Sequence, residues 1–146
     1  MNNLSVGFAR VNITPMMGIG IVGYFVPRFA DGVLDELYVN ALALASGDNK
    51  VVLMTLDNCG ISREVSMDFA ASVSEAAGIP AEAVILHCTH THTAPRYHLK
   101  SGYDRAPRDR VKLYPPEKYR AFLVEQIATA ISRAYNGAAP GSVAYG

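Results

Sequence analysis

Two nearly continuous apolar runs constrain the fold of this chain more than any other feature. They are KVVLMTLD at residues 50–57 and VILHCTH at residues 84–90. Residues 62–78 between them repeat an apolar side chain at every fourth position, which is typical of a helix with one buried face. The repeating residues are Val65, Phe69 and Val73. Strand, helix and strand in this order predict a parallel crossover, and we expect the run at 50–57 to be an interior strand covered on both faces.

The other predicted elements complete a mixed sheet. Residues 4–13 alternate in polarity, and residues 37–46 form an apolar run joined to 50–57 by a Gly-Asp-Asn turn, which favours an antiparallel hairpin. Residues 18–32 contain four glycines and predict a winding loop. A second helix is expected over residues 116–137, with Tyr119, Leu123, Ile127 and Ile131 on one face. The predicted fold class is α/β, a mixed sheet with a strand-helix-strand crossover and helices packed on the sheet.

Length and charge limit what the chain can bind. Half of its 146 residues are hydrophobic, so residues 1–146 are expected to form a single α/β domain. The 13 basic and 13 acidic side chains balance, so no overall charge favours nucleic acid or an anionic membrane. No apolar segment approaches the roughly 20 residues that span a bilayer, and no signal-peptide pattern opens the chain. We therefore expect a cytoplasmic chain without a transmembrane segment.

The candidate chemistry lies in the stretch ILHCTHTHTAP, residues 85–95. If the strand continues through this stretch, His90 and His92 share one face with Cα atoms roughly 6.5 to 7 Å apart, close enough to approach one zinc ion. Asp57 could bring a carboxylate to the same edge, because it ends a neighbouring strand. The alternative is that both histidines are hydrogen-bonded structural residues at the end of a strand. Spacing alone leaves both interpretations open.

Other polar residues give weaker signals. Cys59 is expected to be a small buried hydrophobic residue, and Cys88 lies too far along the strand to share an ion with both histidines. Residues 97–115 carry several basic side chains and little apolar periodicity, so they predict either a solvated loop or a lid. Tyr24 and Arg28 in the glycine-rich loop could line a site or cover nearby apolar surface.

Six motifs follow one another along most of residues 5–95. They are VGFARVNITPMMG, the pair Gly23-Tyr24, DELYVNALAL, VVLMTLDNCGIS, GIPAEAVIL and THTHTAP. In this order they resemble the start of the neutral, non-lysosomal ceramidase family. The resemblance is most specific at THTH followed by two further residues and a proline, and at the Ile-Thr-Pro that ends the first strand. Thr93 and Ala94 stand where the family usually has Ser and Gly, which changes the loop beside the substrate.

The resemblance implies a function and a division of roles. Ceramidases of this family are zinc amidases that cleave ceramide into fatty acid and sphingosine. The resemblance implies that His90 binds Zn2+ and that His92 sits beside the reacting carbonyl. It also implies that a further His, a Glu and a Tyr of the zinc site lie downstream. We therefore expect residues 1–146 to be the N-terminal part of a longer protein, inactive alone, whose partners are a ceramide-like or other amide substrate and the remainder of its own chain.

Two alternatives stay open at this point. One is a non-enzymatic α/β module that binds a partner or associates with itself, in which the histidines are structural. The other is a metal-dependent hydrolase that acts on a substrate other than a lipid. A metal site of the type H-x-H-x-D-H is excluded, because Ala94 and Pro95 occupy the positions of its Asp and its last His.

Overall fold

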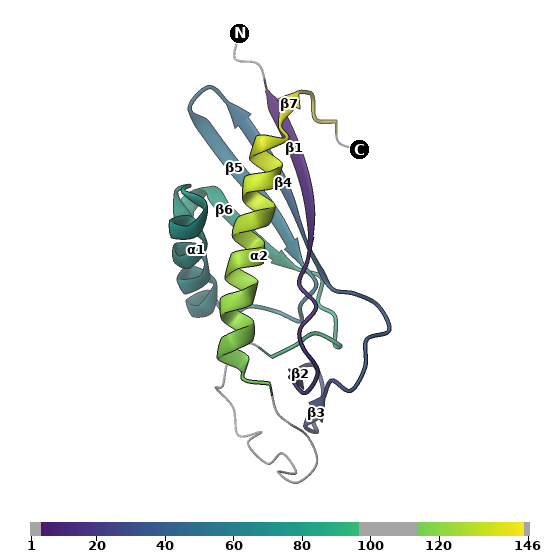
Figure 1. Ribbon diagram of the computed structural model, residues 1–146. Coiled ribbons are helices and arrows are strands. Elements are labelled where there is room, and N and C mark those ends of the chain that lie inside the picture. The colour runs from purple at the N-terminus through teal and green to yellow at the C-terminus, as the bar shows by residue number, and fades with distance from the viewer. Residues whose placement is uncertain (1–3, 97–113, 145–146) are drawn as a thin grey trace.

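Five strands form the main sheet, and a two-stranded ribbon lies at one end of it (Figure 1). The computed structural model describes residues 4–96 and 114–144. Its elements are β1 (Ser5–Asn12), β2 (Gly20–Ile21), β3 (Arg28–Phe29), β4 (Tyr38–Ser46), β5 (Asn49–Leu56), α1 (Arg63–Ala77), a 3-10 turn (Ala81–Ala83), β6 (Val84–Cys88), α2 (Pro116–Asn136) and β7 (Ala139–Pro140). The predicted basic loop at residues 97–115 lies almost entirely outside the described residues.

The order of the strands across the main sheet is β6-β5-β4-β1-β7. β4 and β5 form the predicted antiparallel hairpin, and β1 pairs antiparallel with β4 on one side and with β7 on the other. β5 and β6 are parallel, in register from Val52 opposite Val84 to Leu56 opposite Cys88. The predicted α/β class and its strand-helix-strand crossover are therefore confirmed.

α1 and α2 lie side by side on one face of the sheet (Figure 1). Phe69 and Val73 of α1 are fully buried, as their spacing predicts, whereas the side chain of Val65 lies outside what the structure describes. The two helices and the facing side of the sheet enclose the apolar core. In the described ranges, no helix is both long and apolar enough to cross a membrane.

α2 is the helix that covers the middle of the sheet, against β1 and β4. Its buried residues include the four predicted ones, and they are Tyr119, Leu123, Ile127, Ala130, Ile131 and Ala134. The hydroxyl of Tyr119 donates to the Ile13 carbonyl at 2.8 Å, which ties the start of α2 to the end of β1. At Gly7 the helix comes so close that an added Cβ would lie 1.7 Å from the Ala134 carbonyl oxygen.

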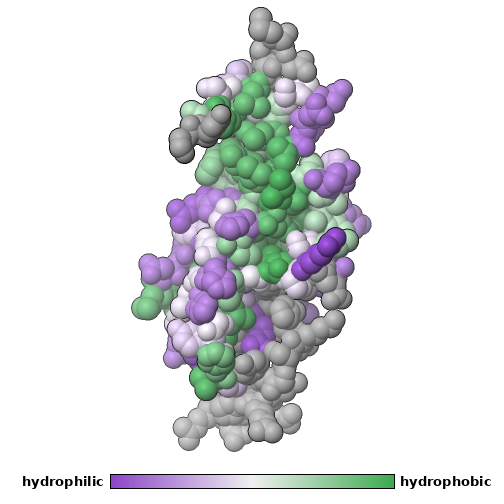
Figure 2. All heavy atoms as spheres, turned by 180° about the vertical axis from the view of Figure 1, so that it is seen from behind, coloured by the Kyte–Doolittle hydropathy of each residue, from purple (hydrophilic) through white to green (hydrophobic). Residues whose placement is uncertain are grey.

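The described residues place no helix on the opposite face of the sheet, so the expectation that β5 is covered on both faces is wrong within this part of the chain. A row of apolar side chains, here called the outer row, crosses four strands in register and consists of Phe8, Leu42, Leu53 and Ile85. Phe8 is 69% exposed, Ile85 51% and Leu53 39%. Figure 2 shows hydrophobic residues gathered on this face. β5 is apolar on both sides, but the crossover helix and α2 both pack on the same side.

Met54 and Leu53 are adjacent on β5 and lie on opposite faces of the sheet. Substituting each of them tests whether only one face is buried. Met54 is 1% exposed and points into the core, so Met54→Ala is expected to lower the free energy of unfolding by about 2–5 kcal/mol. Leu53→Ala on the outer row is expected to cost less than about 1 kcal/mol. Urea denaturation followed by circular dichroism measures both values. Equal costs would contradict an open outer face.

Candidate metal centre

The candidate site lies at the carboxyl ends of β5 and β6. Because these strands are parallel, the loops that follow them leave the sheet at the same edge. Backbone hydrogen bonds continue beyond the strands, from the Thr89 N–H to the Leu56 carbonyl and from the His90 N–H to the Asn58 carbonyl, each at 2.9 Å. The loop after β6 is thereby fixed against the loop after β5.

His90 is oriented by its backbone conformation and by one ring nitrogen. Its φ of 63° lies in the left-handed region, which costs a residue with a side chain roughly 1–2 kcal/mol. Nδ1–H of the ring donates to the Cys59 carbonyl at 2.5 Å. A carbonyl oxygen only accepts, so Nδ1 carries the proton and Nε2 of the neutral ring keeps its lone pair. Histidines that bind metals are commonly oriented in this way.

His92 is held from its other side by the glycine-rich loop. That loop is joined to the segment after the histidines by hydrogen bonds from the Val22 N–H to the Ala94 carbonyl at 3.0 Å and from the Arg96 N–H to the Gly20 carbonyl at 2.7 Å. Gly23 then lies directly against His92, because an added Cβ would be 2.5 Å from Cγ of the imidazole. Its φ of 92° also favours glycine.

Tyr24 and Arg28 belong to the same glycine-rich loop and extend its contact with His92. The Tyr24 ring meets the His92 ring edge to face, with 6.3 Å between the centroids. The Arg28 guanidinium stacks on the Tyr24 ring at 3.9 Å from its centroid, which restrains the aromatic ring. Of the two uses that the sequence left open, Tyr24 lies beside His92, whereas Arg28 contacts the Tyr24 ring and lines the neighbouring cleft.

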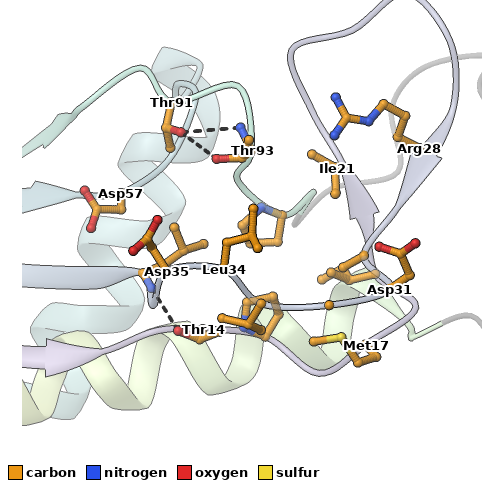
Figure 3. A pocket seen from close by; sticks show the side chains of 17 residues that line it. Thr14, Met17, Ile21, Arg28, Asp31, Leu34, Asp35, Asp57, Thr91 and Thr93 are labelled. Atoms are coloured by element: carbon orange, nitrogen blue, oxygen red, sulfur yellow. Dashed lines mark hydrogen bonds between the residues drawn. The ribbon is translucent and has the colours of Figure 1, made fainter.

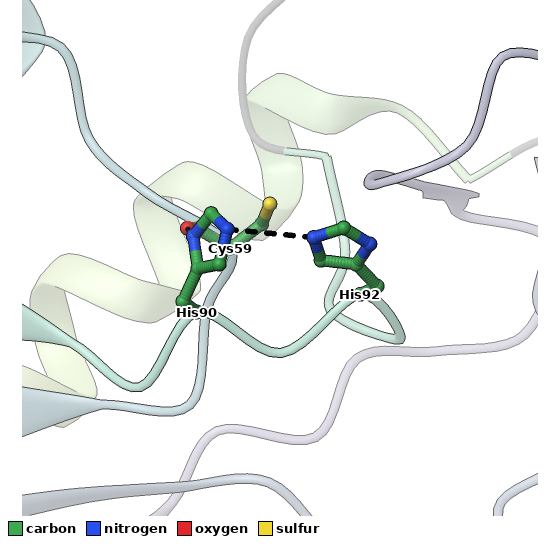
Figure 4. A group of neighbouring side chains, drawn as sticks. All are labelled: Cys59, His90 and His92. Carbon is green, nitrogen blue, oxygen red and sulfur yellow. Dashed lines mark hydrogen bonds between the residues drawn. The ribbon is translucent and has the colours of Figure 1, made fainter.

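Three side chains with metal-ligating atoms converge at this edge of the sheet, namely Cys59, His90 and His92 (Figure 4). Their ligand atoms all lie within 4.8 Å of one another, and the two histidine Nε2 atoms are 3.5 Å apart. Two nitrogens on one tetrahedral zinc, each at 2.0–2.1 Å, lie about 3.4 Å apart. The observed spacing therefore fits two ligands of one ion, and imidazole with thiolate is a donor set that suits zinc.

Asp57 lies at the same edge but is not one of these three residues. Its carboxylate accepts a hydrogen bond from the Tyr38 N–H at 2.9 Å, and its own N–H donates to the Tyr38 carbonyl at 3.0 Å. Both contacts fix the start of β4 to the end of β5. A metal-binding role for Asp57 stays a prediction from the sequence.

A cleft of about 640 Å³ opens on the threonine side of the turn at residues 90–93 (Figure 3). Thr91, Thr93 and Asp57 line it, together with residues of the glycine-rich loop such as Arg28 and Asp31, and neither histidine does. The hydroxyl oxygens of Thr91 and Thr93 are 2.9 Å apart and hydrogen-bonded to each other. Volumes of roughly 300–1,000 Å³ are usual for small-molecule sites, so the cleft is large enough for part of a substrate.

The histidines converge for a reason that differs from the predicted one. β6 ends at Cys88, so His90 and His92 lie in a turn and not on a strand face. The expectation that Cys59 is buried is also wrong, since it is half-buried with two imidazoles beside it. The sequence contained the signal for Cys59, because residues just past two parallel neighbouring strands meet at one edge.

Solved structures of ceramidases are similar to the chain, and two of them are compared with it. A neutral ceramidase from Pseudomonas aeruginosa matches with a TM-score of 0.75 and 21% sequence identity, over 97% of this chain and 23% of its own. A ceramidase complexed with C2 matches with a TM-score of 0.75 and 22% identity, over 97% of this chain and 22% of its own. The chain shares the fold of that part of both proteins. No protein-family model and no curated protein sequence matches it.

Comparing alanine variants of two glycines with positive φ distinguishes loss of the contact with His92 from backbone strain alone. Gly23 and Gly78 have φ values of 92° and 67°, but an added Cβ meets His92 only at Gly23 and meets nothing within 4 Å at Gly78. Each change to alanine is expected to lower the free energy of unfolding by at least about 1–2 kcal/mol. Only Gly23→Ala should shift the imidazole NMR signals of His92. Unchanged signals in folded Gly23→Ala would contradict the contact.

Proposed function

We propose that this chain is the N-terminal part of a ceramidase-like, zinc-dependent amide hydrolase. The observation that carries the proposal is the pair of histidine Nε2 atoms 3.5 Å apart, within a fold that two solved ceramidases share. The order of motifs that ends in THTHTAP supports the same family. Because the chain spans 22–23% of those ceramidases, the activity is proposed for the whole protein.

His90 is the proposed zinc ligand. The Cys59 carbonyl accepts a hydrogen bond from Nδ1–H, which leaves Nε2 as the atom that can bind a metal and fixes the direction of its lone pair. When bound, zinc would supply a Lewis acid and a nucleophilic water at neutral pH. The protein contributes the orientation of the ring, and the strained backbone at His90 is part of that contribution.

His92 is proposed to contact the carbonyl of the substrate. Gly23 leaves its ring room and Tyr24 limits its rotation from one side, so its Nε2 stays near that of His90. An N–H held at this point can donate to the oxygen on which negative charge develops when an amide is attacked. The substrate class is a ceramide-like or other acyl amide, and the cleft beside Thr91 is wide enough to take part of it.

The outer row supports the proposal that more of the same protein packs on this domain. Phe8, Leu53 and Ile85 form an apolar strip that is exposed among the described residues. A contiguous exposed apolar patch commonly marks a surface on which another part of a protein packs. The proposed partner for this face is the part of the whole protein that lies outside these 146 residues. This is in keeping with a match that covers 22–23% of the two ceramidases.

Zinc titration of the wild-type chain and two variants tests the proposed ligand. Removing a group that only orients a ligand costs about 10–100-fold in affinity, so His90→Ala, which removes the ligand itself, should cost at least about 100-fold. His87→Ala is the matched control, because His87 is exposed on the outer face of β6. Its affinity should stay within about twofold of wild type, as for an independent site. Equal weak binding by all three proteins, measured by calorimetry, would favour a module with structural histidines.

Hydrolysis assays test the proposed dependence on the rest of the protein. The zinc-loaded chain of 146 residues is expected to release no fatty acid from a short-chain ceramide above the zinc-free background. The physical reason is that one loop region supplies metal-binding groups but not the surface that positions an amide over them. Hydrolysis that is lost in His92→Ala would contradict this expectation. With the full-length protein, a lipid and a non-lipid acyl amide compared side by side separate the two substrate classes.

A further inference from the structure

The proposed function assigns no role to the thiol of Cys59. It lies in the loop after β5, with its thiol group turned toward both imidazoles (Figure 4). The same residue accepts the Nδ1–H of His90 through its carbonyl oxygen. Cys59 thus contacts His90 through the backbone and faces its Nε2 side through the thiol, which is the side on which a metal would bind.

We propose that Cys59 is a direct metal ligand and that Cys59, His90 and His92 form a three-ligand zinc site within this chain. This inference rests on the proposed zinc site at His90 and adds a thiolate to it. His92, which is proposed to contact the carbonyl in the whole enzyme, completes the set when no substrate is bound. Three protein ligands with a fourth open position are the pattern of catalytic zinc sites.

The distances allow such a site with small movements. Zinc bonds of 2.3 Å to sulfur and 2.0–2.1 Å to nitrogen place the two donor atoms about 3.6 Å apart. The observed ligand atoms are within 4.8 Å of one another. Side-chain rotations that move these atoms by about 1 Å would therefore bring all three within bonding distance of one zinc ion. Both imidazoles are restrained by the contacts described above, so most of that movement falls to the half-buried Cys59 side chain.

Geometry favours Cys59 over the other anionic candidates at this edge. The Asp57 carboxylate already accepts a hydrogen bond from the Tyr38 backbone. Cys88 lies on β6 and is not one of the three residues whose ligand atoms converge. Among the described residues, Cys59 is therefore the side chain that can bring a sulfur ligand to both histidines.

The residue before Cys59 shows that this loop is held at a cost. Asn58 is 1% exposed, and its side-chain Nδ2 has no hydrogen-bond partner among the described residues. A buried donor without a partner costs roughly 1–3 kcal/mol. Its backbone carbonyl, in contrast, accepts the His90 N–H at 2.9 Å. The loop therefore keeps the conformation that presents Cys59 to the histidines although a side chain next to it is unsatisfied.

Cobalt titration distinguishes a sulfur ligand from histidine ligands alone. Wild-type chain with Co2+ should show the near-ultraviolet sulfur-to-cobalt charge-transfer band together with tetrahedral visible bands. Cys59→Ser should lose the charge-transfer band and bind zinc at least about 100-fold more weakly, whereas the matched control Cys88→Ser should keep both properties. These variants differ in one sulfur atom each, and both cysteines are half-buried in the starting protein.

The outcomes separate this inference from the proposed function. Metal binding that depends on His90 but shows no charge-transfer band, with equal affinity for Cys59→Ser, would overturn the thiolate ligand and leave the His90 site intact. Absence of binding by wild type would overturn both. If Cys88→Ser lost the charge-transfer band and Cys59→Ser kept it, the sulfur ligand would be Cys88. That result would also overturn the inference.

Alkylation of the wild-type chain gives a second measurement that does not depend on whether Cys59→Ser folds. Zinc at about ten times its dissociation constant should slow iodoacetamide modification of Cys59 about tenfold, because only the free site reacts. Modification of Cys88, read at the same time by peptide mass spectrometry, should not change. Equal modification of Cys59 with and without zinc would overturn the inference.

Discussion

The parallel pairing of β5 with β6 is the interaction on which the rest of the site depends. It places the ends of two strands, separated in the chain by α1, at one edge of the sheet. Two further backbone hydrogen bonds then extend the ladder into the loops, from Thr89 and His90 to carbonyls of the opposite loop. These contacts are between backbone atoms, and the hydrogen bond from the His90 ring to the Cys59 carbonyl adds a side-chain contact between the same two loops. The side chains decide the chemistry at that edge.

Orientation within the site comes from a few local constraints that reinforce one another. The left-handed backbone of His90 is unfavourable by itself, and the hydrogen bond from its ring to the Cys59 carbonyl offsets part of that cost. On the other side, Gly23 allows the glycine-rich loop to touch His92 directly, and the Tyr24 ring lies across that imidazole. The two histidines are therefore positioned by different segments of the chain, although they are two residues apart. A metal would join these segments and stabilise the arrangement further.

Residue patterns predicted the elements well and the site only in part. The periodicity of α2, the hairpin of β4 and β5 and the crossover followed from apolar spacing, since burial of one face determines that spacing. The uncovered outer row could not be predicted, because a strand that is apolar on both sides looks the same whether one face or two are covered within the chain. The turn at His90 could not be predicted either, since a positive φ at a histidine depends on contacts with Cys59 and Asn58 that are remote in sequence. Cys59 was identifiable in principle from the parallel pairing alone.

The site and the outer row belong to different physical layers of the domain. Leu53 and Ile85 project from the middle of β5 and β6 on the face without helices, whereas the three candidate ligands lie in loops beyond the ends of the same strands. The anchors of those loops are hydrogen bonds to β2, β5 and their own neighbours. Packing of another layer on the outer row would therefore add stability to the sheet without rebuilding the ligand set, because well-separated contacts contribute nearly additively. In the proposed enzyme, this domain would therefore hold the candidate metal ligands in place while the remainder of the protein contributes the surface that positions the substrate.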